Sequence, residues 1–239
     1  MNNEMIVCIP GAWESRKDFL SSVVETTDGE FMLAAMILAH PKGRDHVELE
    51  FAEPYDRMAE AFSSGGRGKL SDETLKKIEK HLSVIYLHFP LDMTSQRLRL
   101  VKFTEVVSRC GGIAVKIENS GIAHEWERWF SLLRSDNPFD SYCASVVLSG
   151  DQQYYYSCGM HNFGLPDAQT SSDFDTQEAA DLLNQFNYYQ VLERPRLESG
   201  HTFSLTAGSP RFRVNRVTDQ RHQEDELFHN PHGLWDLAG

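Results

Sequence analysis

The segment YYYSCGMHNFGLPD, residues 154–167, places several side chains that could do chemistry close together. Cys158, His161 and Asp167 supply a thiol, an imidazole and a carboxylate within ten residues. A cysteine nucleophile needs a base that lowers the pKa of its thiol and a third group that orients the base. His161 could be that base, and Asp167 or Glu118 could orient it if the fold brings them together. The segment is therefore one hypothesis for a catalytic site.

The same segment has a spacing that zinc could use. Cys158 and His161 are three positions apart, and His229 and His232 repeat this spacing near the C-terminus. Together they make a formal set of four ligands for a tetrahedral site, which would also fix the tail to the body of the protein. Against this hypothesis, such gaps arise by chance in a chain with ten histidines, and HNPHG is a natural turn without metal.

A structural interpretation of residues 154–167 needs no chemistry at all. Gly159 and Gly164 permit backbone angles that other residues avoid. Asn162 and Asp167 can bond to the amides of a turn. The sequence favours this structural corner over a catalytic or a metal site.

Other motifs along the chain are incomplete. HEWER, residues 124–128, begins like a metalloprotease helix, but that chemistry needs a second histidine one turn on, and position 128 is arginine. His124 is thus only a further imidazole that a catalytic site could recruit. GGRGKLS, residues 65–71, lacks the spacing of a phosphate-binding loop. Nucleophile-elbow and dinucleotide-binding motifs are absent from the sequence, and no cofactor is expected.

Composition narrows the class of protein. The chain has 239 residues and a net charge of −12, from 35 acidic against 23 basic side chains. Such a surface repels phosphate backbones and anionic lipid, so neither nucleic acid nor a membrane is the expected partner. No apolar run approaches the roughly 20 residues of a membrane helix, and the start does not resemble a signal peptide. We expect a cytoplasmic protein whose four cysteines are free thiols.

Hydrophobic periodicity predicts alternating strands and helices. The predicted helices are residues 15–26, 55–62, 71–80, 95–110, 122–134 and 176–193. The predicted strands are residues 5–9, 30–38, 46–53, 82–89, 113–118, 201–205 and 211–217, with a hairpin across Gly150 and Asp151.

This order of elements predicts an α+β fold, with mixed or antiparallel sheets and packed helices. We expect a single compact domain over residues 1–239. The glycine-rich stretch 63–70 is the best internal boundary, as a flexible linker. Because each half shows a similar order of elements, two ferredoxin-like halves are one topology that the pattern allows.

Several segments carry a resemblance to a known family. CGMHNFGLPD, GHTF and LFHNPHGLW are similar to an uncharacterised bacterial family described only as a domain of unknown function. The family implies no enzyme activity. Small acidic proteins of this kind are often encoded beside antibacterial toxins, and this analogy implies an immunity role.

Two hypotheses for function follow, and a third stays open. The first is a non-enzymatic cytosolic protein that binds a protein partner, such as a basic toxin domain that it inhibits. Its candidate contact residues are acids beside loops, namely Asp173, Asp175, Glu224, Asp225 and Glu226. The alternative is a metal-binding protein or a Cys/His-dependent enzyme that uses residues 158–167, with His124 or His229. A module that binds a small molecule is neither supported nor excluded.

Overall fold

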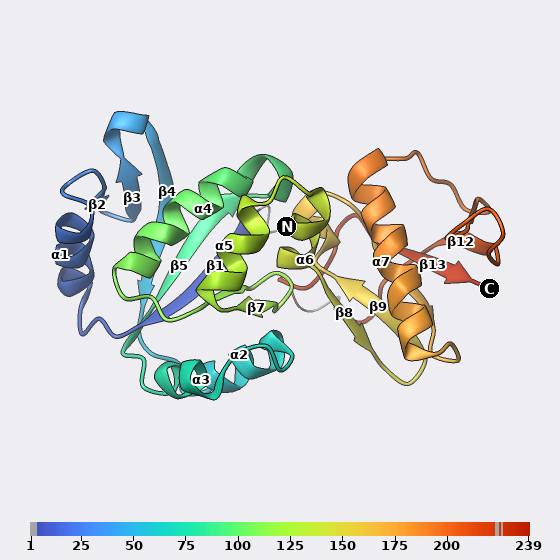
Figure 1. Ribbon diagram of the computed structural model, residues 1–239, viewed down its shortest axis with the longest axis horizontal. Helices are drawn as coiled ribbons and strands as arrows, with labels where there is room; N and C mark the ends of the chain where they lie inside the picture. The colour runs from blue at the N-terminus through green and yellow to red at the C-terminus, as the bar shows by residue number, and fades with distance from the viewer. Residues whose placement is uncertain (1–3, 223–224, 226) are drawn as a thin grey trace. The chain divides into compact units, whose positions relative to one another are not determined.

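The computed structural model describes residues 4–222, 225 and 227–239, which divide into two compact units (Figure 1). The N-terminal unit comprises residues 4–90 and 95–136, and the C-terminal unit comprises residues 91–94 and the described part of 137–239. Each unit has one β-sheet with helices packed on it, so the predicted α+β class is confirmed. The two sheets differ in strand order, and the units therefore do not repeat one ferredoxin-like topology.

The N-terminal unit is built on a seven-stranded antiparallel sheet with the order β2-β3-β4-β5-β1-β6-β7. Its strands are β1 (Glu4–Gly11), β2 (Met32–Ala34), β3 (Ile37–His40), β4 (Asp45–Ala52), β5 (Ser83–Pro90), β6 (Val115–Ile117) and β7 (Ala123–His124). Its helices are α1 (Arg16–Thr26), the 3-10 turn η1 (Pro41–Gly43), α2 (Met58–Gly66), α3 (Asp72–Ile78), α4 (Met93–Arg109) and α5 (Trp126–Arg134).

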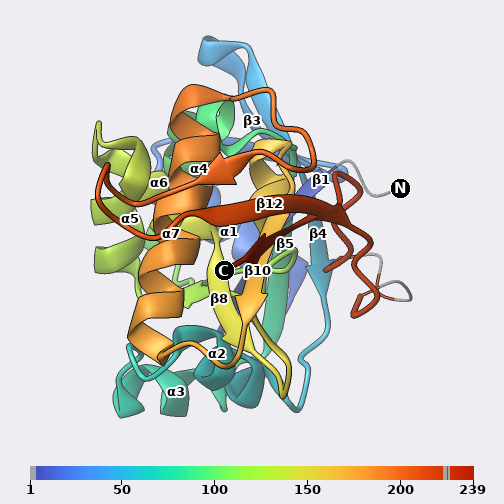
Figure 2. The same cartoon turned by 90° about the vertical axis from the view of Figure 1, so that its right-hand side faces the viewer.

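The two faces of this sheet are covered to different extents. On one face Val7, Ile9 and Leu87 are completely buried, and α4 and α5 lie over it (Figure 1). A hydrogen bond of 2.9 Å from Trp129 Nε1 to Thr104 Oγ1 joins these two helices. On the other face α2 and α3 cover only the end of the sheet that contains Cys8 and its neighbours. Figure 2 shows β3 and β4 extending beyond α2 and α3.

The glycine-rich stretch 63–70 is not a linker between the units. Residues 63–66 are the last turn of α2, and the whole stretch lies inside the N-terminal unit. Close packing explains the glycine, because a Cβ atom on Gly65 would lie 2.0 Å from the carbonyl oxygen of Gly121. The composition resembled a flexible linker, but the glycine is required by a close approach of two backbones.

We expect Gly65→Ala to destabilise the N-terminal unit by about 2 kcal/mol or more, because a backbone atom must move to admit the new methyl group. Gly208→Ala is the matched control, since a Cβ atom there meets nothing within 4 Å. The free energy of unfolding from urea titration measures both. Equal, small effects of the two substitutions would contradict the packing argument.

The C-terminal unit contains a six-stranded mixed sheet with the order β11-β12-β13-β10-β9-β8, in which β10 and β13 are parallel. Its strands are β8 (Val147–Gly150), β9 (Tyr154–Cys158), β10 (Asp167–Ser171), β11 (Thr202–Phe203), β12 (Phe212–Val217) and β13 (Leu234–Ala238). Its helices are α6 (Pro138–Ser145), the 3-10 turn η2 (Met160–Phe163) and α7 (Thr176–Glu193). Helix α7 packs on one face, where Leu182, Leu183 and Phe186 contact Ala168 and Trp235 in one core cluster (Figure 2).

Helix α7 has the bounds that the sequence predicts. The Asp175 side chain accepts hydrogen bonds from the amides of Gln177 and Glu178, as an N-cap should. Across the described residues, no helix combines the length and the apolar character that a bilayer crossing requires.

Candidate functional site

Residues 158–167 form a tight corner between β9 and β10. Gly159 and Gly164 flank the η2 turn with φ angles of 116° and 69°, which favour glycine. The amide of Asn162 donates to the Gly159 carbonyl at 3.0 Å, and the amide of Gly164 donates to the His161 carbonyl at 2.9 Å. These contacts have the geometry of a structural corner.

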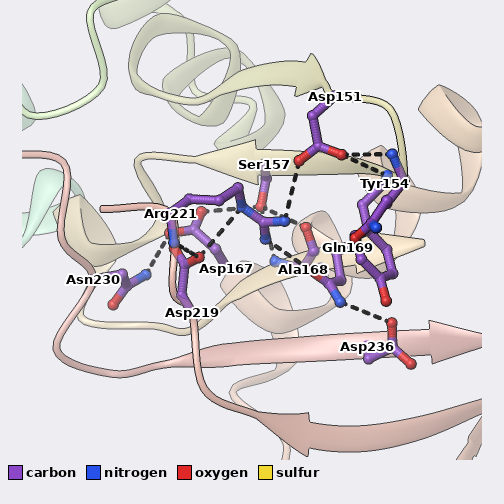
Figure 3. Close-up of polar contacts among 11 residues, drawn as sticks. Asp151, Tyr154, Ser157, Asp167, Ala168, Gln169, Asp219, Arg221, Asn230 and Asp236 are labelled. Atoms are coloured by element: carbon purple, nitrogen blue, oxygen red, sulfur yellow. Dashed lines mark hydrogen bonds and ion pairs between the residues drawn. The ribbon is translucent and has the colours of Figure 1, made fainter. Parts of the chain in front are cut away.

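A buried carboxylate connects this corner to the C-terminal tail. Asp167 is 4% exposed and accepts hydrogen bonds from Ser157 Oγ at 3.0 Å and Asn230 Nδ2 at 2.6 Å (Figure 3). The Met160 amide donates to the same carboxyl group at 3.2 Å. Asn230 also donates to the Leu165 carbonyl at 3.0 Å. One carboxylate thus holds the end of β9, the η2 turn and the loop before β13 together.

Burial governs the ionisation of Asp167. Loss of solvent raises the pKa of this carboxyl to about 7, although the hydrogen bonds from Asn230, Met160 and Ser157 act in the opposite direction. A folded-state pKa above the ordinary value means that the folded protein holds a proton which the unfolded chain releases. The contribution of Asp167 to stability therefore decreases as the pH rises from about 4 to about 7.

Asp167→Ala should destabilise the protein more at pH 5 than at pH 8, with a difference of about 2–3 kcal/mol between the two conditions. At either pH it leaves buried donors of Asn230 and Ser157 without their acceptor. Chemical denaturation at both pH values gives the free energies. Asp173→Ala is the control, since Asp173 is exposed, and a cost of Asp167→Ala that does not change with pH would contradict the raised pKa.

His161 is buried as a neutral imidazole. It is 2% exposed, and neither ring nitrogen has a hydrogen-bond partner within the described part of the chain. Burial, followed by the positive charges that His232, His229 and His222 can carry, lowers its pKa to about 4. The carbonyl of Leu227 lies close enough to oppose this shift in part.

Cys158 does not have the environment of a reactive thiol. It is 6% exposed, and burial raises its pKa well above the ordinary value. The charges of Asp167, Asp219 and Asp225 add to this shift, and the charge of Arg221 opposes it. Because the thiolate is the nucleophile, this environment disfavours catalysis by Cys158 in the conformation described.

Thiol labelling tests that conclusion. We expect iodoacetamide near neutral pH to modify Cys158 about tenfold or more slowly than the half-exposed Cys143, because a buried protonated thiol is inert. Peptide mass spectrometry over time gives the rate at each cysteine. Labelling of Cys158 ahead of the other three cysteines would return this residue to the catalytic hypothesis.

The four proposed zinc ligands are not assembled as a site. Among residues 4–222, 225 and 227–239, no three His, Cys, Asp or Glu side chains are arranged to hold a metal ion. His229 and Asn230 line a surface groove of about 810 Å³ with Arg216 and Asp219, but Cys158, His161 and Asp167 do not line it. His124 and Glu118 belong to the other unit, where His124 is buried beside Trp129 and Glu118 pairs with Lys116.

A chain of polar side chains crosses the sheet face opposite α7, and no motif in the sequence predicts it. Arg221 donates to Gln169 Oε1 at 2.7 Å and pairs with Asp219 and Asp151 (Figure 3). Its guanidinium lies 4.2 Å from the centre of the Tyr156 ring. Gln169 donates in turn to Asp236 at 3.1 Å. Because its charge is already met by two carboxylates, Arg221 fixes the loop after β12 rather than offering an anion site.

Ser157 and Asn230, which donate hydrogen bonds to Asp167, were not among the predicted site residues. Their only signal was position: Ser157 precedes the candidate cysteine, and Asn230 lies inside the HNPHG turn. Serine and asparagine are common on protein surfaces, so their residue types do not indicate a bond to a buried carboxyl group. The bond from Asn230 to Asp167 becomes evident only once β10 is known to pair with β13.

The acids proposed as partner contacts have local roles where they are described. Asp173 accepts from Ser171 Oγ, Asp175 caps α7, and Asp225 accepts from the amides of Leu227 and Phe228. All three are exposed, so a partner could still reach them. Glu224 and Glu226 lie outside the described residues.

The N-terminal unit presents a different surface, which we call the amphipathic lane. It consists of the outward-facing residues of β2–β4, namely Met32, Ala34, Ile37, Glu48 and Glu50. Met32 is 46% exposed, and Glu48 and Glu50 are also exposed. Strand pairing places Ala34 beside Ile37 and Ile37 beside Glu48, so an apolar strip lies next to an acidic one.

Comparison with known families gives one match. Residues 156–237 match the family described as Domain of unknown function (DUF4261). The match covers about a third of the 239 residues, including the 158–167 corner, Arg221 and Asn230. It supports the predicted resemblance to an uncharacterised family for this segment. No curated protein and no solved structure matches the chain.

Proposed function

We propose that this chain is a non-enzymatic, cytosolic protein that binds a basic protein partner. In its more specific form, the proposal is an immunity-type inhibitor of a toxin. The observation that carries it is the amphipathic lane, because exposed apolar side chains gathered beside acids are typical of a protein-binding surface. Methionine suits such a surface, since its flexible thioether adapts to different partners.

The charge of the chain supports a basic partner. The net charge is −12, and Glu48 and Glu50 make no ion pair within the described residues. Complementary charge across an interface speeds association and selects between partners. The unpaired carboxylates of the lane would therefore attract a basic partner and select against an acidic one.

The lane is presented on a well-fixed strand. Leu38, Val47 and Leu49 are almost fully buried on the opposite side of β3 and β4. At the start of β4, Asp45 bonds to Arg99 and Lys102 of α4. Burial raises the pKa of Asp45, but the hydrogen bond from Lys102 and the charge of Arg99 outweigh it and bring the pKa below its ordinary value. A fixed surface loses little conformational entropy on binding.

A metal-binding or Cys/His-dependent role for residues 158–167 is the second candidate. The two unpartnered ring nitrogens of His161 favour it, because a buried imidazole usually has a partner. The raised pKa of Cys158 opposes the catalytic form of this candidate.

Native mass spectrometry of the full chain, purified gently from its own host at low salt, tests both candidates. We expect a heteromeric complex with one defined partner, which separates as the ionic strength rises. A 27.3 kDa monomer with no partner at low salt would contradict the binding proposal. A mass increase of one zinc, lost in His161→Ala, would favour the second candidate.

A further inference from the structure

We propose that the amphipathic lane binds one basic amphipathic α-helix of the partner, which lies over β2 and β3 and runs parallel to β4. This inference rests on the proposed function and names the element that the lane receives. Its basis is the position of two unpaired carboxylates beside a strip of exposed apolar side chains on a sheet face that α2 and α3 leave open.

The spacing of the acids fits a helix. Glu48 and Glu50 are two residues apart on one face of β4, so their Cα atoms are about 7 Å apart at roughly 3.4 Å per residue. Residues i and i+4 of an α-helix are about 6 Å apart along its axis. Two lysines or arginines at that spacing can each reach one carboxylate.

The width of the apolar strip fits the same element. Neighbouring strands are about 4.8 Å apart, so β2 and β3 together make a strip about 10 Å wide. An α-helix with its side chains is about 10–12 Å across. A helix that lies over this strip can place its apolar face on Met32, Ala34 and Ile37 while its basic face reaches Glu48 and Glu50.

Two other occupants fit less well. A strand added to the edge of the sheet would pair with β2, which has only three residues and is followed by Ala35 in the left-handed region, with φ 49°. So short an edge offers few ladder hydrogen bonds. A second copy of the chain would bring Glu48 and Glu50 against the same acids, and like charges in contact repel.

A designed peptide probes the lane directly. The probe is a helical peptide of about 14 residues with leucines on one face and lysines at i and i+4, and its matched counterpart carries glutamates in place of the lysines. Fluorescence anisotropy with the full chain gives the dissociation constant at low and moderate salt. We expect binding of the lysine peptide, weaker at higher salt, and no binding of the glutamate peptide.

Variants locate the contact. Glu48→Lys with Glu50→Lys should weaken binding of the lysine peptide at least tenfold, and Met32→Ser should weaken it several-fold. The control is Glu193→Lys with Glu198→Lys, which makes the same charge change at exposed positions of the C-terminal unit. All these side chains are exposed, and unchanged unfolding midpoints would verify that each variant folds.

Three outcomes would overturn the inference. The control variant could weaken binding as much as the lane variant, which would mean attraction to net charge alone. The lane variant could leave binding unchanged, which would place the site elsewhere. The methionine variant could have no effect, which would exclude the apolar half of the contact.

Failure of the inference can be told apart from failure of the proposed function. If the variant Glu48→Lys with Glu50→Lys still forms the partner complex in the host, the binding function is retained and the lane is not the binding site. Absence of any partner complex would remove the function, whatever the peptide does.

Discussion

The C-terminal unit depends on one buried carboxylate. Asp167 lies at the start of β10, and its hydrogen bonds reach the strand before it, the turn between them and the loop that leads into β13. Burial of an acid is costly, and it is tolerated here because three donors surround it. The parallel pairing of β10 with β13 also begins at Asp167, which lies opposite Leu234. The hydrogen bonds of Asp167 and the pairing of the two strands therefore hold the same part of the sheet in place.

The N-terminal unit is organised by a difference between the faces of its sheet. One face is buried under α4 and α5, and this face alone accounts for most of the apolar alternation in β1, β4 and β5. On the opposite face, α2 and α3 cover the end of the sheet that contains Cys8. The part left open carries Glu48 and Glu50 on β4 and Met32 near the edge, and the proposed binding function rests on this surface.

Sequence reasoning succeeded where a local signal decided the structure. Helix 176–193 was predictable because a capping aspartate and a continuous apolar stripe act within the helix itself. The strand predicted over 30–38 is instead two strands, since Ala35 takes a left-handed conformation that its residue type does not announce. The linker predicted at 63–70 failed for a long-range reason, the contact of Gly65 with Gly121. The corner at 158–167 was predictable from its glycines, but its partner Asn230 is 63 residues away from Asp167 in the chain.

The corner holds two buried ionisable groups whose shifts oppose each other. His161 has a pKa lowered to about 4 and Asp167 a pKa raised to about 7, so both are neutral when the protein is folded at mildly acidic pH. On unfolding in that range, the carboxyl releases a proton and the imidazole takes one up. The two slopes of stability against pH therefore cancel between about pH 4 and 6.5. The combined contribution of His161 and Asp167 to folding stability therefore changes little with pH within this range, although each group alone would make it pH-dependent.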